Sequence, residues 1–352
     1  MMEIKNLVRK NIRDLQPYSS ARSLFSGEDA ILLDANENAN DLFGGHLNRY
    51  PDPLQTALKK SISKVKRVPS KNIFLGNGSD EAIDLLLRIF CEPGKDEIII
   101  CPPTYGMYKV QANIHGALVT EVLLDEDFDL RPDEILDVVK PNSKLLFLCS
   151  PNNPTGNLLD TNRIGYLINN FPGIVVVDEA YIDYAEKESW SYYINEYPNL
   201  VVLQTFSKAF ALAGVRLGMA FASEEIMYYF NSIKFPYNIN VLTQQRVLDI
   251  LKDQIIVDDQ FYVNIKEKNR LELELIQLDI VERIYPSDAN FLLVKMKHSD
   301  IIFQALKAKR IIIRDRSKEP MCGDCLRITI GTKQENDLLI QAIKEVETAS
   351  KA

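Results

Sequence analysis

The sequence predicts an α/β fold with a large unit, built on a mostly parallel, doubly wound sheet, and a smaller α+β unit. Two continuous apolar runs of strand length, Leu145–Leu148 and Ile174–Val177, are typical of parallel strands that are buried on both faces. Ile164, Leu167 and Ile168 recur at helical spacing between them, which completes a strand–helix–strand unit. Short strands and helices alternate again near the C-terminus, behind a long helical stretch.

The composition suits a soluble globular enzyme with a full core. The chain has 352 residues, 46% of them hydrophobic, which is enough for two domains with full cores. Its net charge of −8 argues against a nucleic-acid-binding surface, and no apolar run has the length of a membrane span. Residues 1–14 have the pattern of a short amphipathic helix and not that of a signal peptide, so we expect a cytoplasmic protein.

The cysteines and histidines form no metal-binding pattern. The five cysteines are scattered and odd in number, so a disulfide framework is not expected. Cys322 and Cys325 have the spacing of a metal or redox pair, but a zinc site would need a second pair of ligands. The three histidines fall in no ligand spacing, and we therefore expect no metal site.

Two segments near the N-terminus are candidates for contact with a substrate. Gln16–Arg22 follows the first helix and predicts an extended arm, from which Tyr18 or Arg22 could reach a bound molecule. The polar run that ends at Asn38 and includes Asn36 follows an apolar run and predicts a loop.

Two proline-containing segments present tyrosines from a stiffened backbone. The prolines in Arg49–Pro53 fix φ on both sides of Asp52 and make the segment around Tyr50 rigid. The short strand Glu97–Ile100 leads into a loop that carries Tyr105. A tyrosine in that place suits stacking on a flat ring, although structural packing would explain it equally.

The segment Gly76–Glu81 begins a helix and is a candidate anion site. An apolar helix face follows it, at Ile83, Leu86, Leu87 and Phe90. Ser79 or Asp80 could cap this helix, and the free N–H groups of its first turn, with the helix dipole, would attract an anion. Ordinary capping explains the segment as well. Glu81 replaces the third glycine of a dinucleotide fingerprint, which excludes that motif.

The segment Thr205–Gly218 is the strongest candidate for chemistry. Its small residues allow the backbone to approach a ligand closely. Lys208 could act as a nucleophile if its amine is desolvated or lies near another cation. Thr205, Ser207 and Arg216 could hold a phosphate, although a loop with a surface lysine is the ordinary alternative.

Polar residues follow each of the predicted parallel strands. Asn153 follows the first apolar run, Asp178 and Tyr181 follow the second, and Lys208 follows the third, at Val201–Leu203. Because ligands of doubly wound sheets bind outside the carboxyl ends of the strands, we expect these four side chains to converge on one edge.

The C-terminal part predicts the smaller domain. A mostly helical stretch over residues 240–278 is followed by strands and helices at Asn290–Val294, Ser299–Lys309, Ile311–Arg314, Leu326–Ile330 and from Gln334 onward. We therefore divide the chain into an N-terminal arm (1–30), a large domain (31–255) and a small domain (256–352), with the arm packed against the small domain.

Five segments in order resemble the fold-type-I pyridoxal-phosphate (PLP) aminotransferases of the class II subfamily. They span almost the whole chain and are Arg49–Pro53, Gly76–Glu81, Ser150–Gly156, Asp178–Tyr181 and Ser207–Gly218. Within this family the lysine segment is most similar to that of histidinol-phosphate aminotransferases. Each segment alone is weak support, whereas five in the expected order identify the family.

The resemblance implies a PLP site around Lys208, which would bond covalently to the cofactor. Asp178 would keep the ring nitrogen protonated, because a carboxylate favours a neighbouring positive charge. Asn153 and Tyr181 would bond the phenolic oxygen, and Tyr105 would stack on the ring. The implied phosphate ligands are Gly78, Ser79, Asp80, Thr205, Ser207, Arg216 and Tyr50 of the neighbouring subunit. Lys208, Asp178 and Tyr181 are the predicted catalytic residues.

The resemblance also implies a substrate pocket that accepts anions. Its predicted residues are Tyr18, Asn36, Arg314 and Arg327, and the large domain's active site would be shared between the subunits of a homodimer, with the arm lying against the partner. The two arginines lie on neighbouring predicted strands and suit phosphate and carboxylate groups. Arg316 is an alternative to Arg314, and a surface ion pair is an alternative for either.

The implied activity is transfer of the amino group from L-histidinol phosphate to 2-oxoglutarate, which yields imidazole acetol phosphate and L-glutamate in histidine biosynthesis. The same cofactor residues would also serve a threonine-phosphate decarboxylase-like lyase, or an aromatic or broad-specificity aminotransferase. A PLP-binding transcriptional regulator would need a DNA-binding domain before the arm, and the short N-terminal segment leaves no room for one.

Overall fold

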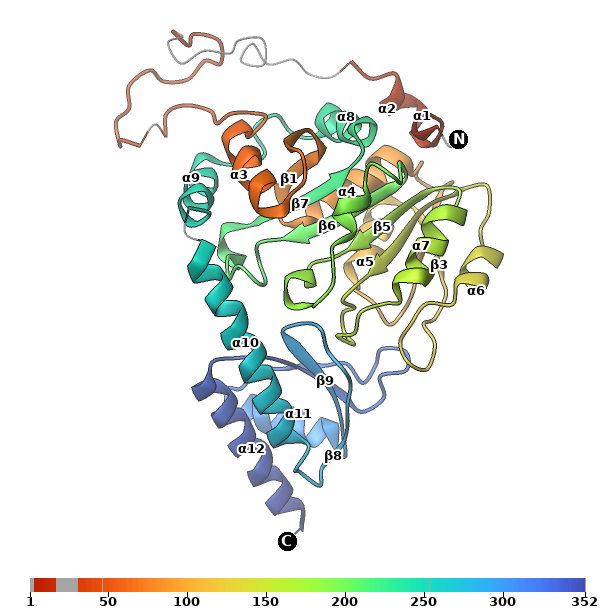
Figure 1. The fold of residues 1–352 in the computed structure, drawn as a ribbon, viewed down its shortest axis with the longest axis vertical. Helices are drawn as coiled ribbons and strands as arrows, with labels where there is room; N and C mark the ends of the chain where they lie inside the picture. The colour runs from red at the N-terminus through yellow and green to blue at the C-terminus, as the bar shows by residue number, and fades with distance from the viewer. Residues whose placement is uncertain (1–2, 17–30, 46, 253, 352) are drawn as a thin grey trace.

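The chain forms two units, each with its own sheet. The computed structural model describes residues 3–16, 31–45, 47–252 and 254–351. A seven-stranded sheet forms the larger unit and a four-stranded sheet the smaller one, and helix α10 (Gln254–Leu275) runs from one to the other (Figure 1). The predicted domain boundary at residue 255 falls at the start of this helix and stays a prediction.

The large sheet is mostly parallel, as the apolar runs predicted. Its strand order is β1-β7-β6-β5-β4-β2-β3, and only β7 pairs antiparallel with its neighbours. The strands are β1 (Ile73–Asn77), β2 (Glu97–Ile100), β3 (Leu118–Glu121), β4 (Ser143–Cys149), β5 (Ile174–Asp178), β6 (Leu200–Thr205) and β7 (Leu217–Ala222). Because β4, β5 and β6 run in the same direction, the polar residues that follow them reach one edge of the sheet.

Helices cover both faces of this sheet, which makes the arrangement doubly wound. One core packs α3 (Thr56–Lys66), α6 (Pro132–Asp137), α7 (Thr161–Asn170) and α9 (Val241–Ile250) against one face. The other core packs α4 (Ser79–Phe90), α5 (Met107–His115) and α8 (Glu224–Ile233) against the opposite face. The continuous apolar strands therefore have no solvent-facing side.

The N-terminal segment consists of two short helices, α1 (Ile4–Leu7) and α2 (Lys10–Arg13), where the pattern predicted one. Ile4 and Val8 are buried in the core that contains α4 and α8, and Arg9 pairs with Glu92 at 3.0 Å. These two helices thus pack against the large unit and not against the small one, which corrects the expectation for this part of the arm. Residues 17–30 lie outside the described residues.

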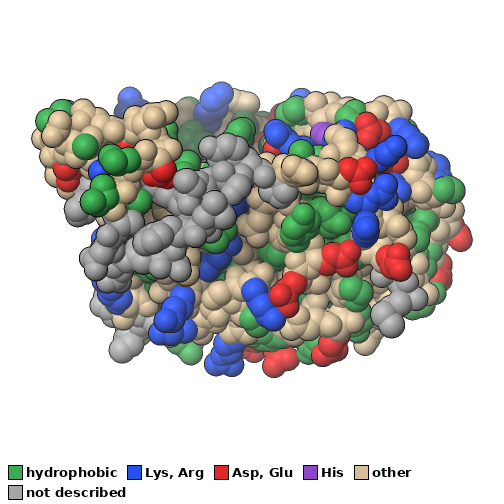
Figure 2. Space-filling model, turned by 90° about the horizontal axis from the view of Figure 1, so that it is seen from above, with side chains coloured by type: hydrophobic (Ala, Val, Ile, Leu, Met, Phe, Trp, Pro, Cys, Tyr) green, Lys and Arg blue, Asp and Glu red, His purple; other side chains and the backbone are tan. Residues whose placement is uncertain are grey.

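Residues 31–45 and 47–50 project from the large unit with exposed hydrophobic side chains (Figure 1). Ile31, Leu33 and Phe43 are 88%, 87% and 89% exposed. Figure 2 shows hydrophobic side chains gathered at this projecting end, whereas basic and acidic side chains are interspersed over the rest of that face. Apolar surface of this kind is typical of a contact with another chain.

The smaller unit has an antiparallel sheet of order β10-β11-β9-β8. Its elements are β8 (Val281–Ile284), β9 (Phe291–Met296), α11 (Ser299–Ala308), β10 (Arg314–Asp315), β11 (Cys325–Thr329) and α12 (Lys333–Lys351). The strand predicted at Ile311–Arg314 is reduced to two residues, because the segment before it is still closing the end of α11, where the Ile311 N–H bonds the Leu306 carbonyl.

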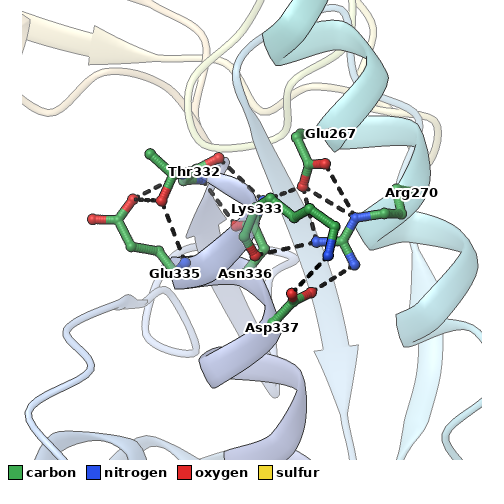
Figure 3. Close-up of polar contacts among 8 residues, drawn as sticks. Glu267, Arg270, Thr332, Lys333, Glu335, Asn336 and Asp337 are labelled. Carbon is green, nitrogen blue, oxygen red and sulfur yellow. Dashed lines mark hydrogen bonds and ion pairs between the residues drawn. The ribbon is translucent and has the colours of Figure 1, made fainter.

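A polar cluster fastens α12 to α10 (Figure 3). Arg270 bonds Glu267 at 2.9 Å and Asp337 at 2.8 Å, and Asn336 donates to Glu267 at 3.1 Å. The apolar faces of the same two helices pack in the core of the small unit. None of the helices that the structure describes combines the length and the apolar character needed to cross a membrane.

Lys59 on α3 is buried with its charge poorly compensated. The side chain is 7% exposed, and its amine forms no hydrogen bond with the described residues. Burial, and then the neighbouring charge of Lys234, lower its pKa to about 8, whereas the unfolded chain keeps a value near 10.5. The folded protein therefore releases this proton at lower pH than the unfolded chain does, and stability rises with pH between these two values.

We expect Lys59→Met to stabilise the protein at pH 7 more than at pH 10. The difference between the two pH values should be on the order of 2 kcal/mol in the free energy of unfolding, because the penalty of burying the charge is largely gone at pH 10. Urea denaturation of both proteins at one chain concentration measures it. Lys60→Met, on the exposed side of the same helix, is the control; a pH-independent effect of Lys59→Met would contradict the prediction.

Candidate active site

A cavity of about 270 Å³ lies at the carboxyl edge of the large sheet and is closed by the small sheet. It collects side chains from the ends of β4, β5 and β6, from the turn between β1 and α4, and from β10 and β11. Predicted residues that line it are Gly78, Ser79, Asp80, Tyr105, Asn153, Asp178, Tyr181, Thr205, Ser207, Lys208, Arg216, Arg314 and Arg327. Residues far apart in the sequence thus meet at the predicted edge.

Lys208 lies in the turn after β6 with its amine near an aromatic face. Its Nζ atom is 5.4 Å from the centre of the Tyr181 ring. Burial lowers the pKa of the lysine, and the charge of Arg327 lowers it further, against an opposing effect from Asp178. A lowered pKa makes the neutral, nucleophilic amine more accessible near neutral pH.

The N-terminus of α4 is left open for an anion. The helix begins after Gly78, which has φ +77°, and no side chain caps it, so the predicted capping by Ser79 or Asp80 is wrong. The Glu81 carboxylate instead accepts the Asn77 N–H, at 2.5 Å. The N–H groups of the first turn therefore remain available to a ligand.

Two glycines allow this turn to lie close to the lysine segment. A Cβ on Gly78 would come 2.7 Å from Nη2 of Arg216, and a Cβ on Gly218 would come 2.1 Å from the Ser79 nitrogen. The Thr205 and Ser207 hydroxyls bond each other at 3.0 Å beside the same space. Hydroxyl, guanidinium and backbone N–H donors surround one small volume, which suits a phosphate.

Asp178 is a buried carboxylate at the end of β5. It is 2% exposed, and burial raises its pKa to about 6. Two donors oppose this shift: the Tyr108 hydroxyl, at 2.7 Å, and the Ala180 N–H, at 3.1 Å. A cation placed in the cavity beside the carboxylate would lower the pKa of Asp178 and balance its negative charge.

Tyr108 is a site residue that sequence reasoning missed. It lies on α5 one helical turn after Tyr105, and it is fully buried between the sheet and the helix. The available signal is that a buried tyrosine needs a partner for its hydroxyl, but the identity of that partner, Asp178, depends on the fold.

Tyr105 and Tyr181 both line the cavity. The Tyr105 hydroxyl bonds Asp80 at 3.2 Å, which ties the loop after β2 to the start of α4. Tyr181 is 7% exposed and packs edge-on against Phe291 of the small sheet, and burial raises its pKa well above the usual range. Both hydroxyls therefore stay protonated and can donate hydrogen bonds.

Three arginines of the small sheet enter the cavity. Arg314 and Arg327 are directly opposite each other on β10 and β11, as predicted, and Arg316 lines the same space. Arg327 donates to the Asn153 side chain, while its Nε, and that of Arg316, are buried and bond none of the described residues. Buried donors and crowded positive charge favour an anionic ligand here.

The other predicted residues do not reach this cavity within the chain. Tyr50 and Asn36 line a separate hollow of about 450 Å³, where Tyr50 stacks on Tyr237 with ring centres 4.5 Å apart. Tyr18 and Arg22 lie outside the described residues. Among the residues that are described, no group of three or more His, Cys, Asp or Glu side chains is arranged to hold a metal ion.

We expect Tyr108→Phe to raise the pKa of Asp178 by about one unit in the cofactor-free protein, because a hydrogen bond to the charged form is lost. Carboxyl-carbon NMR of aspartate-labelled protein, followed through a pH titration, measures this. Tyr105→Phe is the control, since that hydroxyl bonds Asp80 and not Asp178. An unchanged Asp178 titration in Tyr108→Phe would contradict the assigned role.

Comparison with known proteins agrees with this geometry. The family model for aminotransferases of class I and II matches residues 20–343. A histidinol-phosphate aminotransferase of Parabacteroides distasonis is 49% identical over 99% of this chain and 100% of its own length, and one of Christiangramia forsetii is 48% identical over 98% of each.

Solved structures give the same result. The histidinol-phosphate aminotransferase of Clostridium acetobutylicum has a TM-score of 0.78 and 25% identity, covering 86% of this chain and 92% of its own. That of Sinorhizobium meliloti, solved with pyridoxal-5'-phosphate, has a TM-score of 0.79, with 22% identity and 87% and 85% coverage, and it shares the fold. The chain belongs to the class I and II aminotransferases and, within them, to the histidinol-phosphate aminotransferases.

Proposed function

We propose that this protein transfers the amino group of L-histidinol phosphate to 2-oxoglutarate with PLP as cofactor, in L-histidine biosynthesis. The products are imidazole acetol phosphate and L-glutamate, and the reaction is reversible. One observation carries the proposal: a single cavity holds an activated lysine, a buried carboxylate, an anion site and three arginines. The names of the similar proteins supply the substrate.

The cavity fits PLP in its charges and donors. The uncapped start of α4, with Gly78 held against Arg216, offers donors for a phosphate. Asp178, whose burial leaves its charge undercompensated, suits the positively charged ring nitrogen. When bound, PLP would supply an electron sink that stabilises negative charge on the substrate carbon next to the amine. Gly78, Ser79, Asp80, Thr205, Ser207 and Arg216 would hold the phosphate.

The chain's own residues supply orientation and proton transfer. Nζ of Lys208 would take the proton from the substrate carbon next to the amine and pass it to the cofactor, a base role that its lowered pKa favours. Asp178 holds its negative charge with the hydrogen bond from Tyr108. Tyr181 and Asn153 would bond the phenolic oxygen of the cofactor, and Tyr105 would stack on its ring.

The arginines explain how one cavity accepts two different substrates. Histidinol phosphate carries a phosphate, and glutamate carries two carboxylates. We assign Arg327 to the anion common to both half-reactions, because its Nε is buried without a partner in the described chain. Arg314 and Arg316 both line the cavity and are the accessory cations, so Arg316 joins the predicted pair.

We further propose a homodimer in which each subunit completes the other's site. Tyr50 is half exposed and lies away from Lys208 in its own chain, and the projecting residues 31–50 carry uncovered hydrophobic side chains. Docking on a partner would bury this surface and bring Tyr50 to the partner's phosphate site, with Tyr18 and Asn36 at the substrate. The domains would be residues 31–255 and 256–352, preceded by the arm 1–30. Five unpaired thiols suit a cytoplasmic location.

A coupled assay with histidinol phosphate and 2-oxoglutarate should show turnover, with phenylalanine and threonine phosphate as competing donors that react more slowly. Lys208→Ala should lower turnover by about a thousandfold or more, because the group that moves the proton is gone. Lys187→Ala, an exposed lysine, is the control. Carbon dioxide release from threonine phosphate without 2-oxoglutarate, or wild-type turnover in Lys208→Ala, would contradict the proposal.

Mixed dimers test whether the sites are shared. Tyr50→Ala and Lys208→Ala chains should each be poorly active alone. When they are mixed equally, about a quarter of the wild-type site activity should return, because half of the dimers contain one complete site. Mixed dimers that form, shown by differently tagged chains, yet remain inactive would remove Tyr50 from the neighbouring site.

A further inference from the structure

We propose that Asn238 and Lys234 are positioning residues that tie the Tyr50 turn (residues 49–55) to the phosphate turn (residues 76–79) of the same chain. The inference rests on the proposed function, in which the Tyr50 turn serves the partner's site and the phosphate turn serves its own. The two residues thereby make cofactor retention in each site depend on both chains.

Lys234 forms a hydrogen bond with the C-terminal end of the Tyr50 turn. It follows α8, is 8% exposed, and its Nζ donates to the Pro53 carbonyl at 2.8 Å. The same amine donates to the Phe235 and Pro236 carbonyls, at 3.3 and 3.2 Å, which folds the following loop around it. The charge therefore fixes the end of the Tyr50 turn relative to residues 235–238.

Asn238 connects this loop to both turns. Its Oδ1 accepts Gln55 Nε2 at 3.3 Å and Lys234 Nζ at 3.4 Å, on the side of the Tyr50 turn. Its Nδ2 donates to the Leu75 carbonyl at 2.8 Å and to Glu81 Oε1 at 2.9 Å, on the side of the phosphate turn. The side-chain amide of Asn238 thus uses its oxygen for the Tyr50 turn and its nitrogen for the phosphate turn.

Glu81 and Asn77 carry the connection to the phosphate turn itself. The other carboxylate oxygen of Glu81 accepts the Asn77 N–H at 2.5 Å and the Asn77 amide at 2.9 Å. That amide also donates to the Asn238 carbonyl, at 2.8 Å. The residue next along the chain is Gly78, whose backbone precedes the open N–H groups of α4.

The ring of Tyr50 is oriented by the same loop. Tyr237, directly before Asn238, stacks on Tyr50 with the rings inclined by 15°. Gln55, at the other end of the turn, has a left-handed backbone (φ 50°) and a buried Oε1 that bonds none of the described residues. A turn with these unfavourable features needs external contacts to keep one conformation, and Lys234 and Asn238 provide them.

The test places Asn238→Ala in one chain of a mixed dimer and reads the site of the other. One chain carries Tyr50→Ala and an intact Lys208, and its partner carries Lys208→Ala and an intact Tyr50, so that a single complete site remains. Asn238→Ala is added only to the chain that supplies Tyr50. We expect PLP to leave the complete site about fivefold to tenfold faster, as the visible absorbance of the bound cofactor shows after dilution into cofactor-free buffer.

Lys234→Met in the same chain should act in the same direction, and it keeps the test open if Asn238→Ala does not fold. Lys59→Met is the matched control: it removes a buried lysine from the same neighbourhood whose amine forms no hydrogen bond with the described residues of either turn, and it should leave the release rate unchanged. Lys234→Met with a release rate equal to that of Lys59→Met would overturn the assignment of Lys234.

Two failures have different meanings. If the parent mixed dimer, without a change at Asn238, has no active site, the role of Tyr50 in the proposed function is wrong and the inference falls with it. If the parent is active but Asn238→Ala in the Tyr50-supplying chain leaves PLP release unchanged, the proposed function stands and the connection between the turns is refuted.

Discussion

The active cavity depends on one electrostatic constraint: the carboxylate of Asp178, at the end of β5, is 2% exposed. Burial, and to a smaller extent the charge of Asp80, raise its pKa, and the Tyr108 hydroxyl restores part of the lost stabilisation. The Asp178 carboxylate still lacks a positively charged partner, and a protonated ring nitrogen bound in the cavity would supply one. The same low polarity lowers the pKa of Lys208, so that one environment prepares both the acid partner and the base.

The two sheets divide the work of the site. The large sheet supplies the side chains that we propose hold the cofactor and move a proton, and they come from strand ends and the start of α4. The small sheet supplies arginines from two paired strands, and its Phe291 packs on Tyr181. In the proposed function, the contact between the units would place a substrate anion bound by Arg327 against the reacting groups. This arrangement separates the recognition of the substrate from the chemistry.

Sequence reasoning predicted the parts of this site that have a local cause. The apolar runs before Asn153, Asp178 and Lys208 indicated parallel strands, and parallel strands put their ends on one edge. Arg314 and Arg327 were expected on neighbouring strands and lie in register. Of what failed, the partner of Tyr108 and the position of the N-terminal helices depend on contacts between distant segments.

Three features could not be derived from local patterns. Glu81 binds the backbone before the helix and leaves the start of α4 uncapped, so a rule based on nearby hydroxyls chose the wrong residues. Tyr108 reaches Asp178 from helix α5, 70 residues away in the sequence. The short helices at the N-terminus also follow the large unit's surface, which fixes their position more than their own amphipathic pattern does.

Arg316 has a consequence beyond the site. Its Nε, like that of Arg327, is buried beside the cavity and bonds none of the described residues, and such donors favour a small anion. We therefore expect free phosphate or sulfate to compete with an anionic substrate, so that the apparent affinity depends on the buffer.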